Sequence, residues 1–396
     1  MTLPQPGAGP TGAGSKREAV LHVMAAAVFL VFFQAYRLNA TRVSETHSRP
    51  NAGIGPGRNR ASLPRSVDRK EMTKMTKMTK MTKMTKMTKR LLAADQTRLG
   101  FIGMGAMGSR IARRLRDHRY QVTVYDRKRS KADALVPYGA SVAGSLAELA
   151  ANADVILSCL SDDEAVRGVY LAGNGILVST RPGTVVLEMS TISPAASLEL
   201  HAAAAKQGVN LMDVAISGST PAVETGTVTL LAGGDAELFE TAEPIFRALA
   251  THYFLIGPSG SGVSMKLVVN TLLGIGMQAV AEGIALGEAA GIDRKRLLEV
   301  LSQTAVVAPA HVGKLARAEH DDYSPLFGVG LMNKDFHLIL QTAKLLNLVL
   351  PATAAAFEVN SAALRQDPGA DFSFVIRQME SSVARKGSLN APSETA

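Results

Sequence analysis

The stretch Leu99-Gly-Phe-Ile-Gly-Met-Gly-Ala-Met-Gly-Ser109 decides the fold of this 396-residue chain. Its first four residues are typical of a short buried strand, and the residues after it carry apolar side chains at helical spacing. Between strand and helix, Gly103 permits a tight turn, Gly105 lets the backbone approach a pyrophosphate, and Gly108 allows close packing of helix on strand. The stretch therefore predicts a dinucleotide site rather than a glycine-rich turn of an unrelated α/β protein.

We expect all six residues of the turn to contact this cofactor, because the free N–H groups of a helix N-terminus attract phosphates. These residues are Gly103, Met104, Gly105, Ala106, Met107 and Gly108. A second strand, predicted over 121–125, ends at Asp126, where a carboxylate can grip the ribose hydroxyls.

The choice between NAD and NADP depends on the residues that follow this strand. The charge of Asp126 repels a ribose phosphate and favours NAD. Arg127, followed by Lys128 and Arg129, can instead accommodate that phosphate, or the basic run can be a solvated loop. NAD is slightly favoured.

Strand and helix patterns alternate to about residue 256, which predicts an α/β, Rossmann-type doubly wound and mostly parallel sheet. Further strands are expected over 153–159, 184–188, 210–213 and 253–256. Ligands bind such sheets beyond the carboxyl ends of the strands. The glycine turn, Leu160–Asp162, Met189–Thr191 and Ile216–Gly218 should therefore meet at one crevice, which places Leu160 and Thr191 beside the cofactor.

A long apolar run follows a glycine-rich lead-in at 257–262 and predicts a helix of some 29 residues, to about Ala290. Its internal charges favour a buried helix between domains over a membrane span. Lys266 and Asn270 are four residues apart and share one face. Burial would lower the pKa of Lys266 and make it a proton donor and acceptor; the alternative is a side chain that extends to the surface.

The remaining sequence predicts an all-α C-terminal domain joined by this helix. Helices are expected over 294–303, 335–350 and 372–385. The predicted organisation is a disordered or targeting tail over 1–95, a dinucleotide-binding domain over 96–258, a helical substrate and dimerisation domain over 259–385, and a flexible tail over 386–396.

Charge is distributed unevenly along the chain. The first 90 residues hold 17 Lys and Arg against 4 Asp and Glu, whereas the remainder holds 26 against 30. The folded part is mildly acidic, which argues against nucleic acid as its partner. The single cysteine, Cys159, lies in an apolar run and reads as a core thiol, and no spacing of side chains predicts a metal site.

Two features mark the N-terminal segment. Lys16-Arg17 precede an apolar stretch over 19–35, the layout of a signal peptide or anchor, and Met72–Lys89 repeats Met-Thr-Lys six times. We expect the repeat to be disordered and the physiological start to lie at one of its methionines. The protein is then cytoplasmic; membrane or export targeting is the alternative if residues 19–35 are translated and retained.

From residue 98 to about 380 the chain resembles the β-hydroxyacid dehydrogenases, which include 3-hydroxyisobutyrate dehydrogenase, 2-hydroxy-3-oxopropionate (tartronate semialdehyde) reductase and glyoxylate/succinic semialdehyde reductases. Four segments carry the resemblance besides Thr191, which matches a cofactor contact. They are Gly100–Gly108 (cofactor), Asp213–Thr227 (substrate), Gly260–Lys266 with Asn270 (catalysis) and Leu331-Met-Asn-Lys-Asp335 (second cofactor motif).

The resemblance implies NAD- or NADP-dependent oxidation of a small hydroxy acid, with Lys266 and Asn270 catalytic. It further implies that Ser217, Gly218 and Ser219 bind the substrate carboxylate, that Lys334 lies beside the nicotinamide, and that the protein is a homodimer or homotetramer. Ser219 departs from the usual second glycine of the substrate segment, and Ala215 from a common proline, so the substrate cannot be copied from one member. A threonate-type dehydrogenase and a catalytically silent dinucleotide-binding module are the alternatives.

Overall fold

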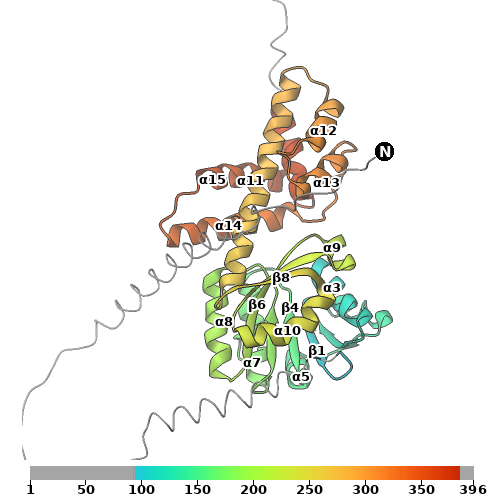
Figure 1. Ribbon diagram of the computed structural model, residues 1–396, viewed down its shortest axis with the longest axis vertical. Coiled ribbons are helices and arrows are strands. Elements are labelled where there is room, and N and C mark those ends of the chain that lie inside the picture. Colours follow the sequence, from blue (N-terminus) through green and yellow to red (C-terminus); the bar gives the residue numbers. More distant parts are fainter. Residues whose placement is uncertain (1–91, 93, 384–396) are drawn as a thin grey trace, which may run out of the picture. The chain divides into compact units, whose positions relative to one another are not determined.

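A computed structural model describes Leu92 and residues 94–383 (Figure 1). The predictions for the N-terminal apolar stretch, the Met-Thr-Lys repeat and residues 386–396 lie outside these residues. Leu92 falls within the predicted tail, yet it is buried against the core that also holds Tyr120.

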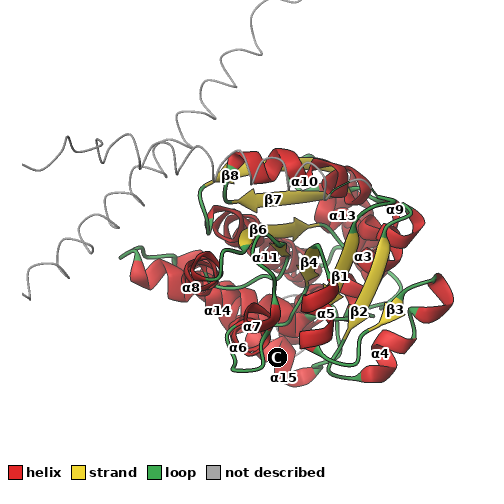
Figure 2. Ribbon diagram, turned by 90° about the horizontal axis from the view of Figure 1, so that it is seen from below, coloured by secondary structure: helices red, strands yellow, loops and turns green. Residues whose placement is uncertain are grey.

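Eight strands form one sheet in the order β3-β2-β1-β4-β5-β6-β7-β8 (Figure 2). The strands are β1 (Arg98–Ile102), β2 (Gln121–Tyr125), β3 (Ser141–Val142), β4 (Val155–Ser158), β5 (Val185–Glu188), β6 (Asn210–Ser217), β7 (Val228–Gly233) and β8 (Ala250–Gly257). All neighbours pair in parallel except β6 and β7, which are antiparallel. The carboxyl ends of β1, β4, β5 and β6 therefore meet at one edge, and the predicted fold class is confirmed.

Helices cover both faces of the sheet. The helices of this part are α3 (Ala106–Asp117), α4 (Arg129–Asp133), η1 (Val136–Tyr138), α5 (Leu146–Asn152), α6 (Asp163–Tyr170), α7 (Ile176–Ser179), α8 (Pro194–Lys206), α9 (Thr220–Thr225) and α10 (Ala236–Leu249). One buried core packs α3 and α10 on one face of the sheet. A second buried core packs α5, α6, α7 and α8 on the opposite face.

The sheet departs from the expected strands at its antiparallel side. The strand expected over 210–213 pairs with β5 over those residues and continues to Ser217, because Asp213–Ser217 pair with β7 on the other side. The expectation overlooked β7, and the strand expected over 253–256 is longer, as β8. The residues of β7 do not alternate between apolar and polar, so the sequence pattern did not reveal the strand that pairs with β6 on the side away from β5.

The C-terminal part is helical, as predicted. Its elements are α11 (Ser261–Ala289), α12 (Arg294–Gln303), α13 (Pro309–Ala318), α14 (Val329–Leu345), α15 (Pro351–Gln366), η2 (Phe372–Phe374) and α16 (Val375–Val383). The helices expected over 335–350 and 372–385 were misplaced. The first begins after Gly328 and ends before the left-handed Asn347, and the second is divided between η2 and α16.

α11 has the 29 residues predicted for it. Within the described part of the chain it is the one helix long and apolar enough to span a bilayer, with mean hydropathy 1.5. It packs against β6 and β7 near its start and against α14, α15 and α16 further along (Figure 1). These contacts are those of a core helix shared by both parts of the fold.

Candidate active site

The glycine turn has the geometry that its sequence predicts. Gly103 is left-handed (φ +94°), and a Cβ there would lie 2.4 Å from the carbonyl oxygen of Cys159. A Cβ on Gly108 would lie 1.9 Å from the carbonyl oxygen of Gly103, so helix and turn touch through this glycine. Gly105 instead faces open space, with nothing within 4 Å of an added Cβ. Backbone can therefore approach a ligand at Gly105.

The N-terminus of α3 offers unpaired backbone N–H groups to an anion. Gly105 caps the helix without a side-chain hydrogen bond, and its first turn holds no acidic residue. The N–H groups of Ala106 and Met107 thus have no partner within the helix. The side chain of Met104 is buried, so this residue contributes backbone only.

Asp126 lies against this turn. One carboxylate oxygen accepts the N–H of Met104 at 2.8 Å, and the other accepts the N–H of Lys128 at 2.8 Å. These bonds hold the carboxylate beside the glycines, where the predicted ribose contact requires it. Arg127 is exposed next to it.

Two further turns join the glycine turn at this edge. The N–H of Leu160 donates to Ser190 Oγ at 2.7 Å, and the Leu160 side chain lies beside Gly103. The carbonyl oxygen of Thr191 accepts a hydrogen bond from Lys334 Nζ at 2.5 Å. Residues of β1, β4, β5 and α14 that are distant in sequence therefore converge, and together they fit a nicotinamide dinucleotide.

Lys266 is buried in α11, with 8% of its surface exposed, and does not extend to solvent. Burial lowers the pKa of its ammonium to about 8; the carboxylate of Asp335 opposes this shift, and the charge of Lys334 adds to it. A lysine with such a pKa can both accept and donate a proton near neutral pH.

Asn270 lies one helical turn from Lys266 and is completely buried. Its Nδ2 donates to Asp335 Oδ2 at 2.5 Å, while its Oδ1 has no hydrogen-bond partner among the described residues. Asp335 is 1% exposed, and its other oxygen lies 2.9 Å from Lys334 Nζ. A buried acceptor without a partner is costly unless a ligand fills the role.

Ser217, Gly218 and Ser219 lie at the carboxyl end of β6. Gly218 has φ +149°, and a Cβ there would meet Val228 at 2.8 Å, so this position requires glycine. α11 packs against β6, which brings the segment toward the helix that holds Lys266. No direct hydrogen bond joins Ser217–Ser219 to Lys266 in the described structure.

Asp213 opens the segment that resembles a substrate-binding one, but the sequence gave it no role of its own; in the structure it anchors the start of α11. Its buried carboxylate accepts the N–H groups of Gly260 at 2.7 Å and Val263 at 3.0 Å, and lies 3.1 Å from His201 Nε2. An anion at a helix N-terminus is stabilising. The position of Lys266 therefore depends on these hydrogen bonds between β6 and the start of α11.

Asp335 was also missed as a functional residue. Its sequence signal was its place at the end of the segment Leu331–Asp335, which resembles a cofactor motif but gave this residue no role of its own. Consecutive residues of a helix point about 100° apart, so Lys334 can reach Thr191 while Asp335 reaches Asn270.

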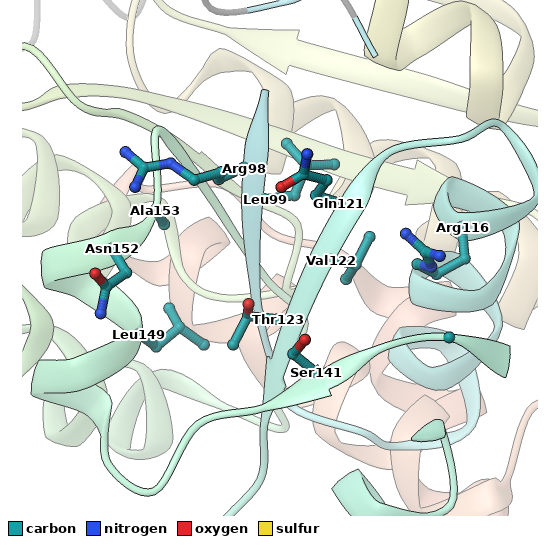
Figure 3. A pocket seen from close by; sticks show the side chains of 11 residues that line it. Arg98, Leu99, Arg116, Gln121, Val122, Thr123, Ser141, Leu149, Asn152 and Ala153 are labelled. Carbon is teal, nitrogen blue, oxygen red and sulfur yellow. The ribbon is translucent and has the colours of Figure 1, made fainter. Parts of the chain in front are cut away.

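A partly open pocket of about 210 Å³ lies at the other edge of the sheet (Figure 3). It is lined by the amino ends of β1 and β2, among them Arg98 and Gln121, and by Arg116 from the end of α3. This cavity is remote from the glycine turn by a full strand length. Cys159 lies near the glycine turn and is partly buried; burial raises the pKa of its thiol to about 12, which disfavours the thiolate at neutral pH.

The fold and the converging turns define a nicotinamide-dependent dehydrogenase. Residues 98–257 match the NAD-binding domain of 6-phosphogluconate dehydrogenase, and 260–379 match the NAD-binding domain of NADP-dependent 3-hydroxyisobutyrate dehydrogenase. The chain belongs to the β-hydroxyacid dehydrogenase family.

Three relatives illustrate this membership. An NAD-dependent L-serine dehydrogenase of Pseudomonas aeruginosa is 36% identical, covering 68% of this chain and 93% of that protein. Glyoxylate/succinic semialdehyde reductase 1 of Arabidopsis thaliana is 34% identical, covering 71% and 98%. The structure of Mycobacterium tuberculosis 3-hydroxyisobutyrate dehydrogenase with L-serine is 27% identical, with a TM-score of 0.66 and coverage of 72% and 99%.

Proposed function

We propose that the protein interconverts a small β-hydroxy acid and its semialdehyde or keto form, with Lys266 as the proton acceptor and donor. The observation that carries this proposal is the position of Lys266. It is buried one helical turn from Asn270 and within electrostatic reach of Asp335 and Lys334. Lys334 in turn donates to the carbonyl of Thr191 at the cofactor turns. A nicotinamide bound at these turns supplies or accepts the hydride.

In the oxidation direction, neutral Lys266 Nζ takes the proton of the substrate hydroxyl. In the reduction direction, its ammonium returns that proton to the developing alkoxide. Asn270 Oδ1 offers the remaining acceptor and suits a hydroxyl or ammonium hydrogen. Asp335 fixes the orientation of the Asn270 amide, and Ser217–Ser219 hold the substrate carboxylate through N–H and hydroxyl groups.

The relatives narrow the substrate class. L-serine and 3-hydroxyisobutyrate both carry a hydroxymethyl group on the carbon next to a carboxylate, and glyoxylate and succinic semialdehyde pair an aldehyde with a carboxylate. We therefore infer a primary alcohol or aldehyde next to, or a few carbons from, a carboxylate. Ser219 narrows the pocket or adds a donor there, which favours a compact substrate.

Turnover of a panel tests this assignment by the absorbance of the reduced nicotinamide. The panel holds L-serine, 3-hydroxyisobutyrate, threonate, tartronate semialdehyde, glyoxylate and succinic semialdehyde. Activity with at least one member is expected. A protein that binds the dinucleotide but turns over none of them would instead be a silent binding module, the alternative against which the presence of both Lys266 and Asn270 argues.

The rates of the two directions should depend on pH in opposite ways. Burial lowers the pKa of Lys266 to about 8, and oxidation needs the neutral amine whereas reduction needs the ammonium. Oxidation should therefore accelerate as the pH rises through about 8, and reduction should slow over the same range. Profiles of kcat/KM in both directions measure this, and parallel profiles would exclude Lys266 as the titrating group.

NAD is the proposed cofactor, since Asp126 is held at the turn by two backbone N–H groups. Asp126→Asn keeps the size and removes the charge. The ratio of kcat/KM with NAD to that with NADP should fall about ten-fold, because repulsion of the ribose phosphate is lost while Arg127 remains. Asp117→Asn, an exposed acid at the end of α3, is the control. An unchanged ratio in Asp126→Asn would assign specificity elsewhere.

We also propose that the protein is a homo-oligomer that pairs through α11. Met265, Val268, Leu272 and Leu286 are exposed along this helix at intervals of three, four and fourteen residues, so they form one apolar stripe. Light scattering in solution measures the molecular mass of the protein. A mass that is a multiple of the 41.7 kDa chain is expected, and the mass of one chain would contradict the proposal.

A further inference from the structure

A buried polar network lies beneath the cofactor turns and has no part in the proton transfer. Its members are Glu188 at the end of β5, Ser158 at the end of β4, Tyr170 at the end of α6, and Ser190. None is more than 1% exposed. A buried carboxyl group requires hydrogen-bond partners, so the network must be ordered for the fold to tolerate it.

Each atom of this carboxyl group is engaged. Glu188 Oε2 is hydrogen-bonded to Ser158 Oγ, which lies 2.6 Å from the hydroxyl of Tyr170. Glu188 Oε1 accepts the N–H of Ser190 at 2.7 Å. Burial raises the pKa of this carboxyl group, and the bonds from its neighbours oppose that shift.

The network continues outward into two of the turns at the crevice. Ser190 Oγ accepts the N–H of Leu160 at 2.7 Å, which joins the turn after β4 to the turn after β5. The next residue, Thr191, accepts the hydrogen bond from Lys334 on α14, and Lys334 lies 2.9 Å from Asp335. A continuous path of polar contacts thus runs from Glu188 to the residues beside Lys266.

We propose that Glu188 is a positioning residue, which sets the Leu160 and Ser190–Thr191 turns relative to each other and thereby places both the cofactor and Lys334. The proposal rests on the dinucleotide site described above. A carboxyl group that served only to fill the core would need no bond to the backbone of a ligand-binding turn. Here its two oxygens divide between the strand β4 and the N–H of Ser190.

Two substitutions of Glu188 separate these roles. Glu188→Ala leaves the N–H of Ser190 buried without its acceptor, so the turns lose their common anchor. Glu188→Gln can still accept that N–H through its amide oxygen and donate to Ser158 through its amide nitrogen. We expect the Kd for NADH to rise about ten-fold in Glu188→Ala, the scale of one lost hydrogen bond, and to stay within about three-fold of wild type in Glu188→Gln.

Thr180→Val is the matched control. Thr180 is also buried, with 7% of its surface exposed, and its hydroxyl donates to the carbonyl of Ile176 at 2.6 Å. It precedes β5, at the amino ends of the strands and away from the cofactor turns. This variant should lower the Tm without changing the Kd. Ser190→Ala removes the acceptor of the Leu160 N–H and the side-chain bond to Glu188, but keeps the bond from the Ser190 N–H. It offers a milder second variant should Glu188→Ala not fold, and its Kd for NADH should also rise.

The readouts are the Kd for NADH, from the fluorescence of the bound nicotinamide, the KM for cofactor, kcat, and Tm. The predicted pattern is a higher Kd and cofactor KM in Glu188→Ala and Ser190→Ala, restored in Glu188→Gln. A Glu188→Ala protein with lower Tm but unchanged Kd, or a Glu188→Gln protein as impaired as Glu188→Ala, overturns the proposal. Failure of the wild-type protein to bind NADH would instead refute the dinucleotide site itself.

Discussion

Lys266→Met should lower kcat in both directions by roughly 10²- to 10⁴-fold, the usual contribution of a general acid or base. Methionine fills the space of the lysine stem but cannot exchange a proton. Binding of NADH should be unaffected, because the cofactor turns do not include this side chain. Steady-state turnover and an NADH titration of the same preparation measure the two effects separately.

The same substitution should raise stability. Burial lowers the pKa of Lys266 from 10.5 to about 8, so the unfolded chain binds a proton more tightly than the folded one does. Below pH 8 the charged amine therefore costs the folded state on the order of 3 kcal/mol, a cost that declines as the pH rises from about 8 to 10.5. The Tm of Lys266→Met should exceed that of wild type at pH 7.

Lys344→Met serves as the control for both measurements, since Lys344 is exposed in the last turn of α14. It should alter neither kcat nor Tm appreciably. A Lys266→Met enzyme with near-normal turnover would remove Lys266 from the mechanism. A Lys266→Met protein of lower Tm would show that the amine has a stabilising partner.

Gly105→Ala should weaken cofactor binding while leaving the free protein folded. Gly105 has φ −74°, which alanine adopts freely, and the added methyl group meets nothing within 4 Å. That empty space is where the pyrophosphate should approach the backbone. A methyl group placed there should weaken NADH binding by about 10- to 100-fold, the scale of overpacking by one group, with a change in stability of less than about 1 kcal/mol.

Gly108→Ala, in contrast, should destabilise the fold as well as weaken binding. Its methyl group would lie 1.9 Å from the carbonyl oxygen of Gly103, so the turn itself must shift. We expect destabilisation by about 1–3 kcal/mol or more, in addition to weaker binding. Gly173→Ala, at an exposed glycine with open space around it, is the neutral control. Equal losses of stability in Gly105→Ala and Gly108→Ala would contradict the separate roles of the two glycines.

Much of the fold follows from local patterns. The glycine turn, the alternation of strands and helices, and the length of α11 are all encoded in short stretches of residues. The parallel strand order then places Gly103, Leu160 and Thr191 at one edge without any knowledge of side-chain contacts. Lys266 could be predicted to be buried because every residue near it in the helix is apolar or small.

Other features depend on contacts between distant residues. Asp335 meets Asn270 across 65 positions, and Asp213 meets Val263 across 50, so no local pattern reveals either pair. The strand β7 is defined by its antiparallel pairing with β6 rather than by its own periodicity. The buried carboxyl group of Glu188 likewise ends an apolar strand in sequence, and only the structure shows its partners.

The central claim is that Lys266 transfers the proton of a hydroxyl group during oxidation of a small hydroxy acid. Its most direct test is the rate of nicotinamide reduction by wild type and Lys266→Met, each saturated with NAD and supplied with L-serine or 3-hydroxyisobutyrate across a range of pH. The wild-type rate should rise with pH and level off above about 8, and that of Lys266→Met should be low at every pH. If the wild type turns over neither of these two, the active substrate of the panel replaces them. A wild-type rate that does not change with pH around 8, or a variant with the wild-type rate and pH profile, would contradict the claim.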